Sequence, residues 1–123
     1  MHDSNYTPLT TFNPPEPFAA IIFDCDGTLV DTAPLYLRAY HAAVERHGAE
    51  MPAEWYFART GLSAEALLRE FSRDFGVQLE PEALLGPITE YYHRGLTELE
   101  VIEIVASVAK RHHGKVPMAV ASA

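Results

Sequence analysis

The sequence is poor in basic residues and contains almost no cysteine. Lys and Arg together number 9 against 17 Asp and Glu, which gives a formal net charge of -8. A chain with this balance offers no basic stripe to nucleic-acid phosphates, so general DNA or RNA binding is not expected. The single cysteine, Cys25, excludes an internal disulfide and is compatible with a reducing compartment.

Long hydrophobic runs are missing as well. The longest apolar run near the N-terminus, residues 18–23, is far too short to cross a bilayer, and no signal-peptide pattern precedes it. We therefore expect a cytoplasmic protein without a membrane partner. The length of 123 residues indicates one domain, or a split domain that carries a small insertion.

The first 17 residues differ from the rest of the chain because prolines are concentrated there. Pro8, Pro14, Pro15 and Pro17 stand among Thr, Asn and Ser. Proline fixes φ and removes a backbone donor, so we expect residues 1–17 to form a poorly ordered, extended arm.

Two short apolar segments predict strands near the two ends of the chain. Ala19 to Phe23 is continuously apolar, which is typical of a strand buried on both faces, and polar residues follow it at once. Val116 to Ala121 predicts a second buried strand, with Pro117 at its start. Open parallel α/β sheets bind their ligands where such strands end in polar loops.

The residues between the two strands show helical spacing of apolar side chains. The predicted helices run from Thr32 to a stop at Gly48, Pro52 to Ala58, Ser63 to Phe75, from Pro81 onward, and Glu98 to His113. One crossover helix would suffice to join two parallel strands, so the additional helices indicate an inserted cap. We expect a partial α/β core from residues 18–32 and 114–123, with a helical cap and connecting helices over 33–113.

The loop after the first strand carries two carboxylates, Asp24 and Asp26. A carboxylate is an established nucleophile for phosphoryl groups, and a neighbouring carboxyl can hold the proton that the leaving oxygen needs. Oxygen ligands of this kind suit Mg²⁺. Gly27 permits a tight turn, and its backbone amide is a candidate phosphate ligand.

Three alternative roles for this loop are less consistent with its residues. An isolated Asp-x-Asp is usually a pair of solvated carboxylates, but here it directly follows a strand and continues as Gly-Thr-Leu-Val-Asp. A calcium EF-hand loop would need glycine at position 29 and an acid at position 35, and both are leucine. A cysteine phosphatase would need cationic surroundings, whereas acids flank Cys25 and the next basic residue is Arg38.

Residues 23–32, Phe-Asp-Cys-Asp-Gly-Thr-Leu-Val-Asp-Thr, closely resemble the first motif of the haloacid dehalogenase (HAD) superfamily. Residues 120–123, Val-Ala-Ser-Ala, resemble its second motif, and the helices between them resemble the small cap of the β-phosphoglucomutase and phosphatase branch. The resemblance covers residues 18–123. It implies an α/β fold, a HAD-like Rossmannoid parallel sheet that is only partly present, with an inserted all-helical cap.

The same resemblance implies roles for individual residues. Asp24 would be the nucleophile and a Mg²⁺ ligand, and Asp26 the acid and base, with its backbone carbonyl as a further metal ligand. Ser122 would bind the phosphate. Thr60, Gly61, Leu62 and Ser63 fall where the cap's substrate loop is expected, although the same residues would also make an ordinary helix stop and N-cap.

The resemblance implies a small phosphorylated metabolite as the substrate. Individual residues that depart from or match the patterns of its branches help to choose between a phosphatase and a mutase. Ala64 replaces an arginine expected in β-phosphoglucomutase, Tyr36 replaces a common histidine, and Thr28 matches the phosphatases. These residues favour a fructose-1-phosphate phosphatase over the alternative, β-phosphoglucomutase. The third-motif lysine and fourth-motif acids would come after Ser122, so a third alternative is a non-catalytic fragment that binds a partner or oligomerises through exposed sheet edges.

Overall fold

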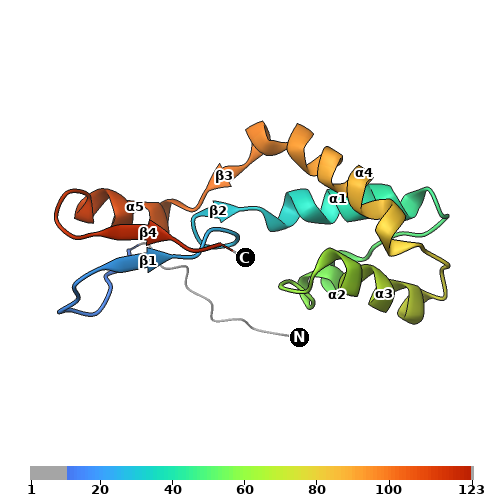
Figure 1. The fold of residues 1–123 in the computed structure, drawn as a ribbon, viewed down its shortest axis with the longest axis horizontal. Helices are drawn as coiled ribbons and strands as arrows, with labels where there is room; N and C mark the ends of the chain where they lie inside the picture. The colour runs from blue at the N-terminus through green and yellow to red at the C-terminus, as the bar shows by residue number, and fades with distance from the viewer. Residues whose placement is uncertain (1–10, 123) are drawn as a thin grey trace, which may run out of the picture. The chain divides into compact units, whose positions relative to one another are not determined.

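The structure is a computed structural model that describes residues 11–122. Contacts between residues divide the chain into two compact units, one formed by residues up to Asp31 and from Glu100 onward, the other by Thr32–Leu99. The first unit contains β1 (Ile21–Phe23), β2 (Val30–Asp31), β3 (Glu100–Val101), α5 (Glu103–His112) and β4 (Met118–Val120) (Figure 1). The second contains α1 (Ala33–Glu45), α2 (Ala53–Phe57), α3 (Ala64–Phe75), α4 (Pro81–Arg94) and the 3₁₀ helix η1 (Leu96–Glu98).

The first unit is built on a parallel pair of strands from distant parts of the chain. β1 pairs with β4 so that Phe23 lies opposite Val120. β1 is two residues shorter than the strand predicted over 19–23, and β4 is three residues shorter than the strand predicted over 116–121. The carbonyl of Pro117 accepts a hydrogen bond from Ile21 N–H (3.0 Å), so the proline stands at the strand's start, where it needs no donor. The predicted α/β class with a short parallel sheet is confirmed.

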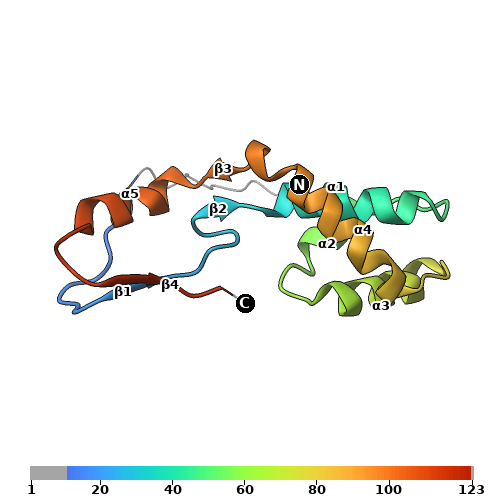
Figure 2. The same cartoon turned by 45° about the horizontal axis from the view of Figure 1, so that its top comes forward.

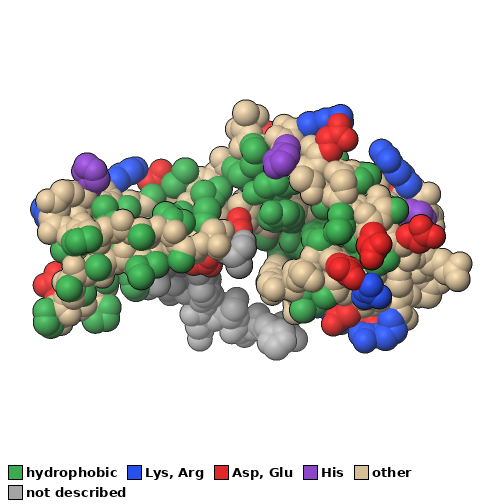
Figure 3. Space-filling view, viewed as in Figure 1, with side chains coloured by type: hydrophobic (Ala, Val, Ile, Leu, Met, Phe, Trp, Pro, Cys, Tyr) green, Lys and Arg blue, Asp and Glu red, His purple; other side chains and the backbone are tan. Residues whose placement is uncertain are grey.

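The sheet of this unit is covered on one face. Phe23 is 8% exposed, whereas Ile22, which points to the opposite face, is 72% exposed. α5 runs along one side of the strand pair in both ribbon views (Figures 1 and 2), and hydrophobic side chains gather over β1 and β4 in Figure 3. The prediction that the first strand is buried on both faces is therefore wrong for the described residues, in which α5 is the sheet's single covering helix.

A second, antiparallel pair of strands is a feature that the sequence pattern did not predict. Val30 lies opposite Val101 and Asp31 opposite Glu100, and Ile102 N–H donates to the Leu29 carbonyl (2.8 Å). These bonds hold residues 100–102 extended, so α5 begins at Glu103 and not at the predicted Glu98. α5 thereby belongs to the first unit, whereas the predicted division placed residues 33–113 together.

The described part of the N-terminal arm contacts α5. Residues 11–17 form no helix or strand, but Arg111 donates to the carbonyl of Phe12 (2.5 Å) and to Asn13 Oδ1 (3.2 Å). The ring of Phe18 packs edge-on against His112, with the ring centres 5.3 Å apart. Residues 1–10 of the predicted arm lie outside the described residues.

The helices of the second unit follow local signals in the sequence. α3 begins where Ser63 Oγ accepts a hydrogen bond from Ala66 N–H (3.2 Å), and it ends at Gly76, whose φ of 64° is the left-handed conformation that glycine favours. Both predicted ends of this helix are confirmed. α4 continues through Pro87 as one helix. No helix in the described part of the chain is long and apolar enough to cross a membrane.

Helices α1 to α4 enclose a common apolar core. Its buried members are Ala39, Tyr40, Ala43, Val44, Met51, Tyr56, Leu67, Leu68, Phe71, Leu84 and Ile88. Of the aromatic residues in these helices, Tyr40, Tyr56 and Phe71 are buried in this core, whereas Phe57, Phe75 and Tyr91 are exposed by 46%, 42% and 38%. α4 approaches α1 so closely that a Cβ at Gly95 would lie 2.4 Å from Leu35 Cδ1, so this position accepts no larger side chain without rearrangement.

Burial of a tyrosine in this core makes the second unit sensitive to alkaline pH. Desolvation, with a smaller contribution from Tyr36, raises the pKa of Tyr40 from 10.0 to about 12. Because the folded-state pKa lies above that of the unfolded chain, the stabilisation is complete below pH 10 and is lost as the pH rises through about 12. We expect the free energy of unfolding to fall by about 2–3 kcal/mol over this window and Tyr40→Phe to remove most of that loss.

The measurement is urea unfolding at pH 8 and at closely spaced values above pH 10. Tyr91→Phe is the matched control, since Tyr91 is 38% exposed. An equal pH dependence in the Tyr40→Phe variant and the wild type would contradict this assignment.

Candidate active site

The loop that carries Asp24 and the end of β4 lie at the same edge of the parallel sheet. Asp24 directly follows β1, and Ala121 N–H donates to the Phe23 carbonyl (2.8 Å), which extends the pairing one residue beyond β4. Ser122 is the next residue. Because parallel strands present their carboxyl ends at one edge, the fold brings the first and second motif segments together there, as the sequence predicts.

Backbone hydrogen bonds close the Asp24 loop into a tight turn. The Cys25 carbonyl accepts from the N–H groups of Thr28 (3.1 Å), Leu29 (2.9 Å) and Val30 (3.2 Å). Gly27 has a φ of 72°, which other residues rarely adopt, and its N–H donates to the Val30 carbonyl (2.8 Å). The amide of Gly27, predicted as a phosphate ligand, is thus already used inside the loop in this structure.

The two carboxylates of the loop are accessible to solvent. Asp24 and Asp26 are both exposed, and Asp24 Oδ1 accepts a hydrogen bond from Cys25 N–H (2.9 Å). This contact orients the Asp24 carboxylate and leaves its second oxygen, Oδ2, without a protein partner among the described residues. Ser122 is exposed as well.

The donor set at this edge fits magnesium in its chemistry. Mg²⁺ prefers oxygen ligands, keeps several waters and is usually held by one or two carboxylates together with phosphate oxygens. Asp24 and Asp26 supply such carboxylates. Among residues 11–122 no group of three or more His, Cys, Asp or Glu side chains converges to form a complete metal-binding cluster.

The predicted substrate segment, Thr60 to Ser63, belongs to the second unit and joins α2 to α3. Its first three residues are exposed, and Gly61 adopts a φ of 101° that permits the sharp turn. Ser63 forms the N-cap of α3, so the ordinary helix-cap role is confirmed for this residue. A substrate role for the segment stays a prediction.

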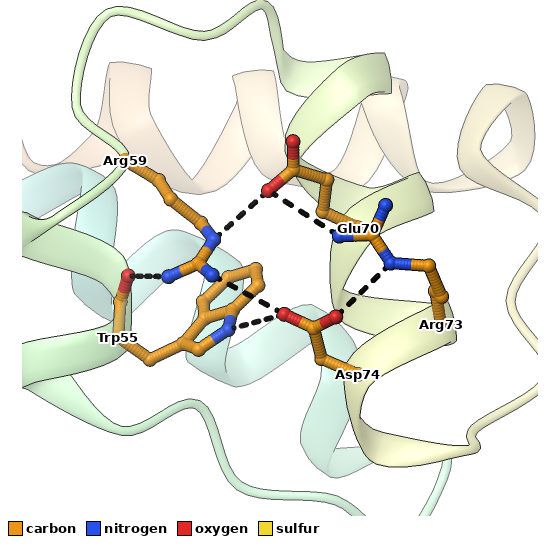
Figure 4. A network of polar contacts seen from close by, with 5 residues as sticks. All are labelled: Trp55, Arg59, Glu70, Arg73 and Asp74. Carbon is orange, nitrogen blue, oxygen red and sulfur yellow. Dashed lines mark hydrogen bonds and ion pairs between the residues drawn. The ribbon is translucent and has the colours of Figure 1, made fainter.

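An arginine next to this segment joins α2 to α3, and the sequence reasoning missed it. Arg59 donates from Nε to Glu70 (2.9 Å), from Nη1 to the Trp55 carbonyl (3.1 Å) and from Nη2 to Asp74 (3.3 Å), and it lies over the Trp55 ring (Figure 4). Hydrogen bonds from the Trp55 indole and then from Arg73 hold the pKa of the Asp74 carboxyl below its usual value. The available signal was a pair of i, i+4 spacings: 55/59, which runs from α2 into the turn after it, and 70/74 within α3.

Comparison with known proteins agrees with this arrangement. The sequence model of the haloacid dehalogenase-like hydrolases matches residues 21–123. The chain belongs to this family.

Among the curated relatives of this HAD family member is the fructose-1-phosphate phosphatase YqaB of Escherichia coli (strain K12). It is 30% identical over 106 residues, which cover 85% of this chain and 56% of that protein. Two solved structures are each 25% identical to the present chain. One is a Thermotoga maritima protein assigned as a beta-phosphoglucomutase (TM-score 0.62, 85% and 50% of the two chains), and the other is CbbY of Rhodobacter sphaeroides in complex with phosphate (TM-score 0.65, 85% and 50%).

The HAD chain spans about half the length of the relatives that it matches. Its match to the family begins at Ile21, so the proline-rich arm lies outside the matched residues. The Asp24 loop and Ser122 both lie within them.

Proposed function

We propose that the protein is a phosphatase that transfers the phosphoryl group of a small sugar phosphate to Asp24 and then to water. The observation that carries this proposal is the pairing of β1 with β4, which puts the exposed Asp24 loop and Ser122 at one edge of a parallel sheet. Family membership supports the same chemistry, and the YqaB relative supports fructose 1-phosphate as the first substrate to test.

The proposed reaction has two steps. Asp24 Oδ2 attacks phosphorus, the bond from phosphorus to the sugar oxygen breaks, and Asp26 donates a proton to that oxygen. Water then attacks the phosphorus of the aspartyl-phosphate while Asp26 takes its proton, which releases phosphate and restores the Asp24 carboxylate. In this proposal the Ser122 hydroxyl donates a hydrogen bond to the phosphate. When bound, Mg²⁺ would neutralise phosphate charge, with the Asp24 carboxylate and the Asp26 carbonyl as its protein ligands.

The proton-transfer role of Asp26 can be separated from that of the nucleophile. We expect Asp26→Asn to lower the turnover of fructose 1-phosphate about 10²–10⁴-fold, because the sugar alkoxide then leaves without a proton. p-Nitrophenyl phosphate has a leaving group that needs no proton, so the variant should keep a first-turnover burst of p-nitrophenolate in a stopped-flow experiment on the full-length protein. Loss of that burst together with sugar-phosphate turnover would contradict the acid role of Asp26.

A phosphomutase is the second candidate because of the likeness to the Thermotoga maritima protein. β-Glucose 1-phosphate with its bisphosphate activator separates the two: a mutase forms glucose 6-phosphate, whereas a phosphatase releases inorganic phosphate. Ala64, in place of the arginine expected of a mutase, favours the phosphatase. We also propose a cytoplasmic location, which the single cysteine supports.

A further inference from the structure

The Asp24 loop is hydrogen-bonded to the parallel sheet at one end and to the start of α5 at the other. At the first end, Ala121 N–H donates to the carbonyl of the last residue of β1 (2.8 Å). At the second end, Ile102 N–H donates to the Leu29 carbonyl (2.8 Å). Asp26 lies between these two attachments, so its position relative to Asp24 depends on both of them.

The turn between the two attachments is joined by its own hydrogen bonds and shifts as one piece. The Cys25 carbonyl accepts from three N–H groups, of which the last is that of Val30 (3.2 Å), and Gly27 N–H donates to the Val30 carbonyl (2.8 Å). Asp26 forms an isolated β-bridge with Val30. A shift of Val30 therefore carries Asp26 with it, whereas Asp24 directly follows β1 and stays with the sheet.

Ile102 is a fixed point from which this turn is held. It is the N-cap residue of α5, and its carbonyl accepts hydrogen bonds from Val105 N–H (3.1 Å) and Ala106 N–H (3.0 Å). The side chains of Ala106 and Val108 are buried, which anchors the helix in the first unit. The β2–β3 ladder has only two residue pairs, so the bond from Ile102, one residue beyond that ladder, is a substantial part of what holds the turn.

We propose that Ile102 is a positioning residue whose backbone N–H, by holding the Leu29 carbonyl, keeps Asp26 in place for proton transfer beside Asp24. This inference rests on the proposed phosphatase function and deepens it by naming a group outside the loop on which the acid step depends. Asp24 depends less on this contact, because the pairing of β1 with β4 fixes it from the other end.

The test uses Ile102→Pro, which removes the N–H donor at a residue whose φ of -82° is close to that of proline. The preceding residue lies in β3, and an extended conformation is the one that a residue before proline prefers. In the full-length protein we expect the first turnover of fructose 1-phosphate to slow about 10-fold, because a displaced Asp26 protonates the sugar oxygen poorly. The first-turnover burst of p-nitrophenolate from p-nitrophenyl phosphate needs no such proton and should stay within about threefold.

Hydrogen exchange measures the same contact without any substrate. The N–H groups of Thr28, Leu29 and Val30 all donate to the Cys25 carbonyl, and loosening of the turn opens these bonds to solvent. We expect these three amides to exchange about fivefold faster in Ile102→Pro than in the wild type. Unchanged exchange in α5 and unchanged thermal unfolding would localise the effect to the turn.

Glu103→Pro is the matched control. It places proline one residue later, at the first position of α5, where a helix leaves the N–H without an intrahelical partner and proline is well tolerated. It should leave the exchange of the turn and both first-turnover rates within about twofold of the wild type. Ile102→Ala separates the N–H from the side chain, since it keeps the donor. A loss in this variant equal to that of Ile102→Pro would assign the effect to side-chain packing and overturn the proposal.

An amide-to-ester replacement at Ile102 provides a second variant should Ile102→Pro fail to fold. It removes only the N–H group, keeps the isoleucine side chain, and should show the same selective loss on fructose 1-phosphate. Equal slowing with both substrates, or unchanged rates and exchange, in a variant with unchanged thermal unfolding would overturn the positioning role alone. Absence of turnover of both substrates by the wild type would instead overturn the proposed function, and the positioning role with it, even where the exchange result was as expected.

Discussion

Asp24→Asn is expected to abolish phosphate release from sugar phosphates, with a fall of at least about 10³-fold in kcat. An amide of the same shape cannot attack phosphorus, so no aspartyl-phosphate forms. The variant should keep its fold, because Asp24 is exposed and its hydrogen bond from Cys25 N–H to Oδ1 can be made by an amide oxygen. The loss would therefore report chemistry and not stability.

The measurement is phosphate release from fructose 1-phosphate, together with mass spectrometry of acid-quenched protein. The wild type should yield a phosphorylated peptide that contains Asp24, and the variant should not. Glu100→Gln is the control, since Glu100 is an exposed carboxylate of the same unit in β3, with no proposed role in the reaction. Normal turnover by Asp24→Asn would rule out the aspartyl-phosphate mechanism.

The features that could be predicted from the sequence are those with local causes. The ends of α3 follow from Ser63, which caps the first turn, and Gly76, which accepts a positive φ. The Asp24 loop was predictable because a short apolar strand is followed directly by acids and a glycine. Its partner Ser122 could be found through the resemblance of its own segment to a second motif, and parallel pairing then brings both to one edge.

The features that could not be predicted depend on contacts between distant residues. The pairing of Val30–Asp31 with Glu100–Val101 involves two-residue strands, which are too short to show a period of two, so residues 98–101 were predicted as part of a helix. The Arg59 contacts with Glu70 and Asp74 join residues 11 and 15 positions apart. The spacings 55/59 and 70/74 each mark one side of this network, but no local pattern shows that the two sides meet. The prediction that β1 is buried on both faces was wrong for a similar reason. A continuous apolar run shows that both faces of a strand are hydrophobic, but it does not show whether other elements pack on both of them.

The largest stability effect is expected from the core of the second unit. Phe71 is fully buried, and its ring contacts Trp55 edge-on (5.4 Å between ring centres) and stacks on Phe75 (4.6 Å). Phe71→Ala should lower the free energy of unfolding by about 3–5 kcal/mol, because it loses the transfer term and leaves a cavity among helices that cannot fully collapse. A loss of this size is a large share of the stability of a small domain.

Trp55 is the only tryptophan of the chain, so its fluorescence during urea unfolding reports the second unit selectively. Phe75→Ala is the matched control: the same substitution one helical turn later, at a ring that is 42% exposed, should cost only about 1–2 kcal/mol. Equal losses at the two positions would mean that the apolar stripe of α3 does not face the core. A larger loss of unfolding free energy at Phe71 would instead show that the apolar interior shared by α1 to α4 stabilises this unit. Exposed ion pairs of α3, such as that between Arg69 and Glu65, contribute little individually.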